Sequence, residues 1–218
     1  MTMKRATGNL KLVGGRLCLD FVNTVYARAV GEAPAKRARG DYLSGDDKLT
    51  SYPDLVAWGA RAGLLADKEA RRLLRAADDR PKTAGAVLKR AVKLREAIYR
   101  IIKSRLGGKR SDEADLRTIN EELAFAKDHQ RLMSKADGFS LEWIDDDSLD
   151  RVLWPVARSA AEVLTSDELN RVRQCGGENC GWLFLDASRN RSRQWCDMRD
   201  CGNIAKVRRF RQRRQEKQ

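Results

Sequence analysis

The sequence has no long apolar stretch. No run among its 218 residues approaches the roughly 20 apolar residues that a helix needs to cross a bilayer. Lys11, Arg16 and Asp20 interrupt the segment after Met1, so this segment lacks the apolar core of a secretory signal. These absences argue against a membrane protein, and we expect a protein of the cytoplasm with no membrane partner.

Histidine is almost absent. His129 is the single histidine, so a Ser/His/Asp or Cys/His catalytic set exists only if this residue serves in it. The sequence also shows no phosphate-cradling glycine motif, no zinc-protease pair of histidines and no pattern of catalytic carboxylates. We therefore expect a protein that is not an enzyme.

Positive charge, by contrast, is abundant and unevenly distributed. The chain has 44 Lys and Arg against 31 Asp and Glu, a net charge of +13. Residues 171–218 contain 13 of the basic and 5 of the acidic residues, so a net +8 falls on the last 48 residues. A polyanion is a natural partner for such a segment.

Apolar periodicity predicts a mainly α N-terminal domain over residues 1–165. The strongest helical pattern lies between Pro81 and Gly107, and a second covers residues 149–164. Alternation at residues 141–144 predicts a strand that pairs with an early strand at 10–13, which gives the domain a small β element. The polar stretch 31–47 is typical of a loop. A boundary at 165–167 then leaves residues 166–218 as a second, smaller unit.

Four of the five cysteines lie in this smaller unit. Cys175 and Cys180 are separated by four residues, Cys196 and Cys201 again by four, and fifteen residues separate the pairs. Two thiolates on each of two arms suit tetrahedral Zn²⁺, and four thiolates leave no open position, so we expect one structural zinc ion. The alternatives are a redox pair, which usually has two residues between its thiols, and unrelated buried thiols. Cys18 stands alone in an apolar segment and is expected to be a buried core thiol.

The zinc module is expected to be α+β, with a β-hairpin and a C-terminal helix. Residues 182–185 have strand character and would return through 194–195, with a basic tip at 188–193. Ile204, Val207 and Phe210 recur every three residues, which predicts a helix packed on the module by a narrow apolar stripe. The basic residues expected to contact nucleic acid are Arg189, Arg191, Arg193, Lys206, Arg208, Arg209, Arg213 and Arg214. A solvated basic tail or a protein-docking module are the alternatives.

The N-terminal unit offers one candidate ligand site. Asp20 and Asn23 are three residues apart in an apolar segment, so on a helix they would share a face and present polar groups to a small molecule. Arg158 would complete this pocket. The alternative is that Asp20 and Asn23 cap or bind neighbouring backbone.

Several of these residues carry a resemblance to a known family. The segments Cys-Gly-Trp-Leu-Phe-Leu-Asp at 180–186, Ser-Arg-Asn at 188–190, Trp-Cys-Asp-Met at 195–198 and Cys-Gly-Asn at 201–203 resemble the CGNR zinc finger. Leu-Cys-Leu-Asp-Phe-Val-Asn-Thr at 17–24 resembles the opening of the ABATE domain, which precedes this finger in proposed stress-induced transcription regulators of bacteria. The fourth letter of the name CGNR stands for Arg, and this sequence has Ile204 at that position.

The resemblance implies zinc binding and a role in transcription. Together with the charge distribution, it leads us to expect a DNA-binding transcription regulator whose N-terminal domain senses a small-molecule effector, with a homodimer as one arrangement on DNA. The alternative is a small-molecule-binding protein or an enzyme in which the zinc module serves stability or protein docking.

Overall fold

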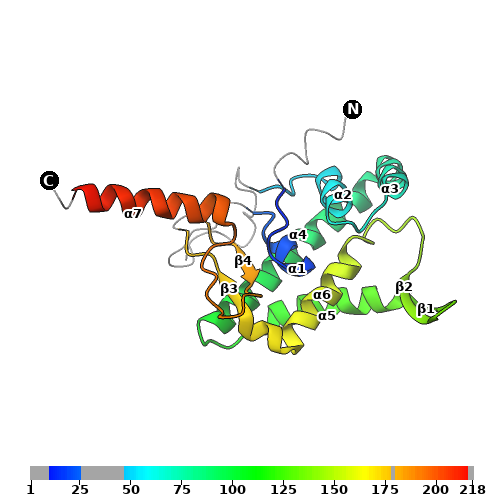
Figure 1. Ribbon diagram of the computed structural model, residues 1–218. Helices are drawn as coiled ribbons and strands as arrows, with labels where there is room; N and C mark the ends of the chain where they lie inside the picture. The colour runs from blue at the N-terminus through cyan, green and yellow to red at the C-terminus, as the bar shows by residue number, and fades with distance from the viewer. Residues whose placement is uncertain (1–9, 26–46, 178–179, 216–218) are drawn as a thin grey trace.

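One long helix forms the centre of the fold. The computed structural model describes residues 10–25, 47–177 and 180–215, and in it α4 (Pro81–Leu106) contacts each of five other helices. These are α1 (Leu17–Val22), α2 (Tyr52–Arg61), α3 (Asp67–Asp79), α5 (Glu113–Asp128) and α6 (Leu153–Thr165) (Figure 1). Val87, Leu94 and Ile98 lie on its buried face, and Gly107 follows its last turn. The helix predicted between Pro81 and Gly107 is confirmed.

Local sequence signals set the starts of two further helices. Ser51 accepts a hydrogen bond from the backbone N–H of Asp54, and the Asp54 carboxylate accepts one from the backbone N–H of Ser51, which forms a capping box before α2. Pro155 lies in the first turn of α6, where its missing N–H has no intrahelical partner to lose. Pro155 therefore marks the start of the helix expected over residues 149–164 and does not kink it.

The short helix α1 is almost entirely buried. Cys18, Leu19, Phe21 and Val22 are inaccessible to solvent, and the rings of Phe21 and Trp58 lie 4.8 Å apart between centroids. Burial raises the pKa of the Cys18 thiol to about 12, so this cysteine is the core thiol that its apolar surroundings predicted. α1 contacts α4, α6 and the strand β4 (Leu183–Leu185) of the zinc module.

The small β element of the N-terminal part is a local hairpin. β1 (Gln130–Lys135) pairs with β2 (Gly138–Trp143) in antiparallel register, so the pairing expected between residues 10–13 and 141–144 is wrong. A two-residue turn joins the strands, and Gly138 has φ +140, which only glycine adopts readily. Residues 10–13 form no strand, and the adjacent Gly14 carbonyl accepts a hydrogen bond from the Leu185 N–H at 2.7 Å.

The C-terminal part contains a second hairpin and a helix. After a 3₁₀ turn, η2 (Asp167–Arg171), β3 (Val172–Gln174) pairs with β4 (Leu183–Leu185), and a π-helical turn, η3 (Met198–Gly202), leads into α7 (Asn203–Gln215). The expected hairpin and C-terminal helix are both present. The partner of β4, however, is β3 and not residues 194–195, so the first cysteine pair lies at the turn of the hairpin.

The helix α7 projects away from the rest of the molecule (Figure 1). Ile204, Val207 and Phe210 are 65%, 51% and 62% exposed, and α7 has no buried residue. The expectation that this apolar stripe packs on the zinc module is therefore wrong. The periodicity predicted the helix but could not specify whether a partner covers it.

The loop expected at residues 31–47 lies outside the described residues except for its end at Asp47. The Asp47 carboxylate is fully buried and accepts hydrogen bonds of 2.7 and 2.6 Å from the guanidinium of Arg95, which is also fully buried. Among the described residues, no helix is long and apolar enough to cross a membrane.

Candidate metal centre and nucleic-acid interface

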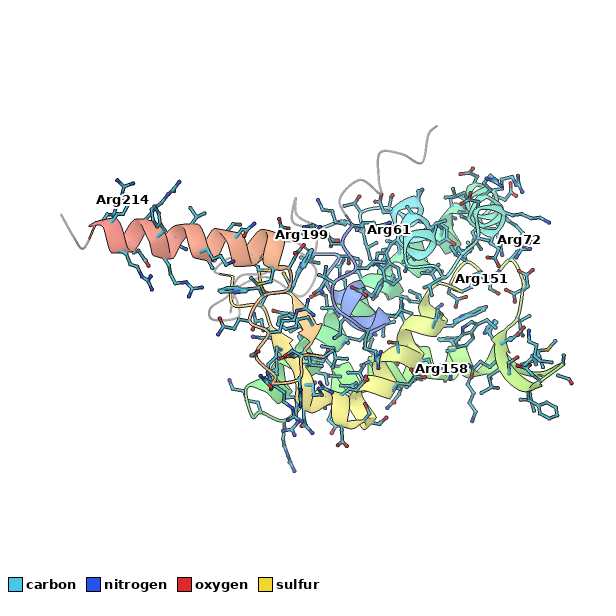
Figure 2. The ribbon with its side chains drawn as sticks, viewed as in Figure 1. Arg61, Arg72, Arg151, Arg158, Arg199 and Arg214 are labelled. Carbon is cyan, nitrogen blue, oxygen red and sulfur yellow. The ribbon has the colours of Figure 1, made fainter. Side chains whose placement is uncertain are left out.

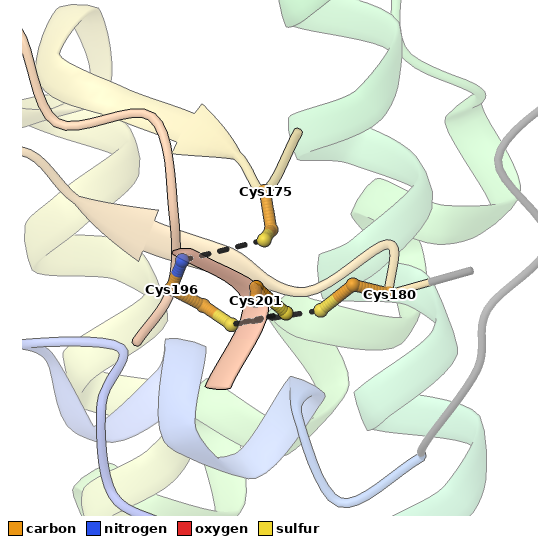
Figure 3. A group of neighbouring side chains, drawn as sticks. All are labelled: Cys175, Cys180, Cys196 and Cys201. Carbon is orange, nitrogen blue, oxygen red and sulfur yellow. Dashed lines mark hydrogen bonds between the residues drawn. The ribbon is translucent and has the colours of Figure 1, made fainter. Parts of the chain in front are cut away.

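Four cysteine side chains converge at one point in the C-terminal part (Figure 3). Cys175 and Cys180 flank the turn between β3 and β4, Cys196 precedes η3, and Cys201 lies within it. Their four sulfur atoms all lie within 4.8 Å of one another, and Cys175, Cys180 and Cys196 are buried. The cysteine pairs that are distant in the sequence therefore form one cluster.

The sulfur spacing fits a tetrahedral zinc ion. The Sγ atoms of Cys180 and Cys196 lie 3.5 Å apart and those of Cys196 and Cys201 lie 3.7 Å apart. Four thiolates at about 2.3 Å from Zn²⁺ are separated from one another by about 3.8 Å. The N–H groups of Gly177 and Cys196 also point to the Cys175 sulfur, at 3.5 and 3.3 Å, and such contacts stabilise a ligating thiolate.

The close spacing of the four thiols also affects their charge states. Hydrogen bonds from Cys180 and Cys196 lower the pKa of Cys175, whereas the pKa of Cys180 is raised because it donates to Cys175. The pKa of Cys201 is raised because burial penalises its charged form. Four thiolates this close together would repel one another without a metal ion, and a bound Zn²⁺ offsets that repulsion and holds all four sulfurs as thiolates.

Two glycines allow the close approach of the ligands. A Cβ at Gly177 would lie 3.1 Å from the Cys180 Cβ and 3.2 Å from the Cys201 Sγ, so a side chain there would displace the cluster. Gly181 has φ +69 directly after Cys180. Glycine is therefore required at these two positions.

The basic tip at residues 188–193 is a turn organised by a buried aspartate. The Asp186 carboxylate accepts hydrogen bonds from the Ser188 N–H at 2.9 Å and from the Arg193 N–H at 3.1 Å, and Asp186 is fully buried. Arg189 and Arg191 remain exposed on the turn. Their positions are compatible with the contacts expected of them.

Arg193 lies in a different environment from its two neighbours. Its guanidinium donates to the carbonyls of Val13 and Trp195 at 3.0 Å each, and it lies 4.3 Å from the centroid of the Phe184 ring. It also donates to the Cys196 carbonyl at 2.5 Å. Since these contacts occupy its Nε and Nη2 groups, Arg193 holds the zinc module against the N-terminal segment, unlike the exposed Arg189 and Arg191.

The helix α7 carries the largest group of exposed basic side chains in the C-terminal part. Figure 2 shows Arg199 near its base and Arg214 towards its far end. Its exposed basic residues are Lys206, Arg208, Arg209, Arg211, Arg213 and Arg214, and it contains no Asp or Glu. Arg199 and Arg211 were not among the sequence candidates. Arg211 lies beside the apolar stripe, which the sequence predicts to be covered. Because α7 is exposed all round, Arg211 is exposed as well.

The structure separates Asn23 from Asp20. Helix α1 ends at Val22, so Asn23 lies beyond the helix and does not share a face with Asp20. Asn23 is 4% exposed, its Nδ2 donates to the Leu183 carbonyl at 2.8 Å, and its Oδ1 accepts from the Leu183 N–H at 2.9 Å. Both polar ends are thus bound to the backbone of β4, and Asn23 does not line the ligand pocket expected of it.

Asp20 and Arg158 do line one pocket. This cavity of about 540 Å³ lies between α1, α6 and the end of β2, and Ser159, Glu162 and Trp143 are also part of its wall. The Asp20 carboxylate accepts a hydrogen bond from the Gly14 N–H at 2.7 Å. Burial raises its pKa to about 6, although backbone hydrogen bonds act in the opposite direction.

Two family models match the chain. Residues 15–167 match ABATE, described as "Putative stress-induced transcription regulator", which covers more than half of the chain. The chain belongs to the ABATE family. Residues 171–214 match the CGNR zinc finger, and this match contains all four clustered cysteines. The search of curated proteins found no match.

The pocket and the cysteine cluster lie in different matched regions. The ABATE region contains α1 to α6 and the residues of the pocket between 15 and 162, and the finger region contains β3, β4, η3 and nearly all of α7. Neither family is one of enzymes. Within the finger, the four cysteines hold one structural zinc ion, because four thiolates fill its tetrahedral coordination.

Proposed function

We propose that this ABATE protein is a DNA-binding transcription regulator in which residues 166–218 contact DNA and residues 1–165 sense a small molecule. The observation that carries the proposal is α7, a projecting helix with six exposed basic residues and no acidic one. The zinc cluster anchors the base of this helix through Cys201, which lies in η3 directly before it. The proposal includes no catalytic step.

The charge of α7 suits contacts with DNA phosphates. Arg209 and Arg213 are four residues apart and therefore lie on the same side of the helix, and Lys206 is three residues before Arg209. Phosphate contacts by such residues provide affinity and orientation, whereas base contacts provide specificity. Arg189 and Arg191 on the turn after β4 offer a second, separate group of cations.

A short N-terminal segment connects the pocket with the zinc module. We call residues 11–15 the connecting segment. On one side, the Leu12 side chain and Gly15 line the pocket. On the other side, Lys11 pairs with Asp197 at 3.1 Å and also contacts Asp200, and the Val13 and Gly14 carbonyls accept hydrogen bonds from Arg193 and Leu185. A ligand that moves this segment would change the position of the finger, and this is the route we propose from effector to DNA.

The partners follow from this function. We propose duplex DNA and a small-molecule effector as partners and the cytoplasm as the location, because a bacterial regulator acts on DNA there. A homodimer that places two fingers on adjacent half-sites would compensate for the modest specificity expected of one small module.

The test is a binding selection of the full-length, zinc-loaded protein on random duplex DNA, followed by titration of a selected duplex at several salt concentrations. If about five phosphates are contacted, the logarithm of the affinity should fall with the logarithm of salt with a slope of roughly −4 to −5. Replacing Arg209 and Arg213 together by Ala should reduce the magnitude of the slope by about 2. Replacing Arg71 and Arg75 by Ala is the matched control, because it removes the same charge from the exposed face of α3.

Two results would reject the proposal. One is binding no tighter than the non-specific range of roughly 10⁻⁴ M at about 50 mM salt. The other is an equal loss of affinity in the α7 variant and in the α3 control. The exposed apolar residues Ile204, Val207 and Phe210 favour protein docking as the second candidate function, and either result would promote it.

A further inference from the structure

The pocket of the N-terminal part has the size and the mixed lining of a small-molecule site. Its volume of about 540 Å³ falls within the range of roughly 300–1,000 Å³ that is typical of such sites. Leu12 and Trp143 provide apolar surface, and Asp20, Arg158 and Glu162 provide charges. Figure 2 shows Arg158 on α6.

The charges of this pocket are paired except for one. Arg158 Nε donates to Glu162 Oε1 at 2.8 Å, and Arg16, which also lines the pocket, donates through Nε to Glu168 Oε2 at 2.7 Å. Among the described residues, Asp20 forms no ion pair. Its partners there are the backbone N–H groups of Gly14, at 2.7 Å, and of Val13.

We propose that this pocket binds a small organic cation, an amine with an apolar or aromatic body. Its ammonium group would lie against the Asp20 carboxylate, and its body would pack on Trp143 and Leu12. The proposal deepens the sensing part of the proposed function and rests on that part, but it is independent of DNA binding.

Three physical arguments favour a cation over an anion or a neutral ligand. The half-buried Asp20 carboxylate has no positive partner, so an ammonium group would add a new charge-assisted contact there. A carboxylate ligand would gain less binding free energy from Arg16 and Arg158, because both are already paired. The face of an aromatic ring such as Trp143 attracts cations. Finally, burial raises the pKa of Asp20, and a bound cation would favour the charged form of its carboxylate.

The experiment compares three probes that share one ring and differ in charge. They are 2-phenylethylammonium, 2-phenylethanol and 3-phenylpropionate, titrated against the full-length, zinc-loaded protein at pH 7.5 and followed by heteronuclear NMR. The ammonium probe should bind tightest and should shift signals of Asp20, Ser159 and Trp143. In Asp20→Asn its affinity should fall at least about tenfold, because a charge-assisted contact is lost, while the affinity of the alcohol stays the same.

Glu162→Gln is the matched control, since it removes the same charge from the same pocket. Glu162 is already paired with Arg158 and its side chain is 60% exposed, so the ammonium affinity should change less than about threefold. Arg158→Gln removes a cation from the wall and leaves Glu162 without its partner, so it should strengthen binding of the ammonium probe by a similarly small factor. This variant and the order of the three probes on the unmodified protein keep the proposal testable if Asp20→Asn does not fold.

Four outcomes would overturn the proposal. They are tightest binding by the carboxylate or the alcohol, an ammonium affinity that Asp20→Asn leaves unchanged, weaker ammonium binding in Arg158→Gln, and no binding of any probe at concentrations up to about 10 mM. Each of these outcomes concerns the pocket alone. Loss of DNA binding in the α7 variant tests the finger alone, so the two proposals can fail separately.

Discussion

Replacing Asn23 by Ala should destabilise the whole chain, because this side chain bonds the N-terminal part to the zinc module. Asn23 makes hydrogen bonds of 2.8 and 2.9 Å with the carbonyl and the N–H of Leu183. Leu183 is fully buried and Asn23 is 4% exposed, so water cannot replace either bond. Each buried group left without a partner costs about 1–3 kcal/mol, so the loss of two partners should lower the free energy of unfolding by roughly 2–6 kcal/mol.

The loss should be visible in both stability and zinc retention. A loss of about 3 kcal/mol lowers the melting temperature of a chain of this size by roughly 6–12 °C. Equilibrium denaturation in urea would measure the change in free energy, and the rate of zinc release to a coloured chelator would report the loosened hairpin. Asn23→Asp should be at least as destabilising as Asn23→Ala, because it removes the donor and places a carboxylate oxygen next to the Leu183 carbonyl.

The matched control replaces a second asparagine, one that is exposed. Asn170→Ala removes an exposed asparagine in η2 and should change the free energy of unfolding by less than about 0.5 kcal/mol. If Asn23→Ala behaves like Asn170→Ala, with unchanged zinc release, then the clamp between Asn23 and β4 does not carry the stability assigned to it.

Four further predictions concern the zinc module and the pocket. Arg193→Ala should lower the free energy of unfolding, measured in urea, by roughly 2–4 kcal/mol, because several carbonyls and the Phe184 ring lose their partner. Arg189→Ala should lower it hardly at all. Equal losses in the two variants would contradict the different roles assigned to Arg193 and Arg189. Cys196→Ser should lower the zinc content from about one ion per chain. It should also remove protection against amide hydrogen exchange from β3 and β4 but not from α4. Full zinc retention would refute the assignment of Cys196 as a ligand. The pKa of Asp20, about 6 in the folded protein, lies above its value in the unfolded chain, so the native state binds more protons between about pH 4 and 6 and stability falls as the pH rises through this window. Asp20→Asn should therefore gain up to about 3 kcal/mol relative to the unmodified protein at pH 7 and nothing at pH 4, and a gain that is the same at both values would contradict the shift. Ile204→Arg places an additional cation on the exposed first turn of α7. The slope of the logarithm of DNA affinity against the logarithm of salt should become steeper by about 1, which titration at several salt concentrations would check. An unchanged slope would show that position 204 does not reach a phosphate.

The cysteine cluster illustrates what short-range patterns can predict. Each pair has its two ligands within six residues, so a tight turn is enough to bring both to one ion, and the spacing alone indicated the zinc site. The central helix was equally predictable, because its apolar period is repeated over 26 residues and glycine follows it.

The pairing of strands could not be predicted in the same way. Residues 141–144 and 182–185 have strand character, but each could pair with several segments, and the actual partners are β1 and β3. A polar strand such as β1, which is almost entirely exposed, leaves little periodic signal in the sequence.

The sequence by itself determined the zinc ligands, the central helix and the basic charge of the C-terminal helix, because each depends on residues that are near one another in the chain. Only the tertiary structure decided the roles of Arg193 and Asn23. Arg193 and Arg189 stand in the same basic run, yet only Arg193 bonds to Val13, and Asn23 bonds to a residue 160 positions later. Such partners are selected when the whole chain packs, since burial of a polar group requires a hydrogen-bond partner that the local sequence does not specify.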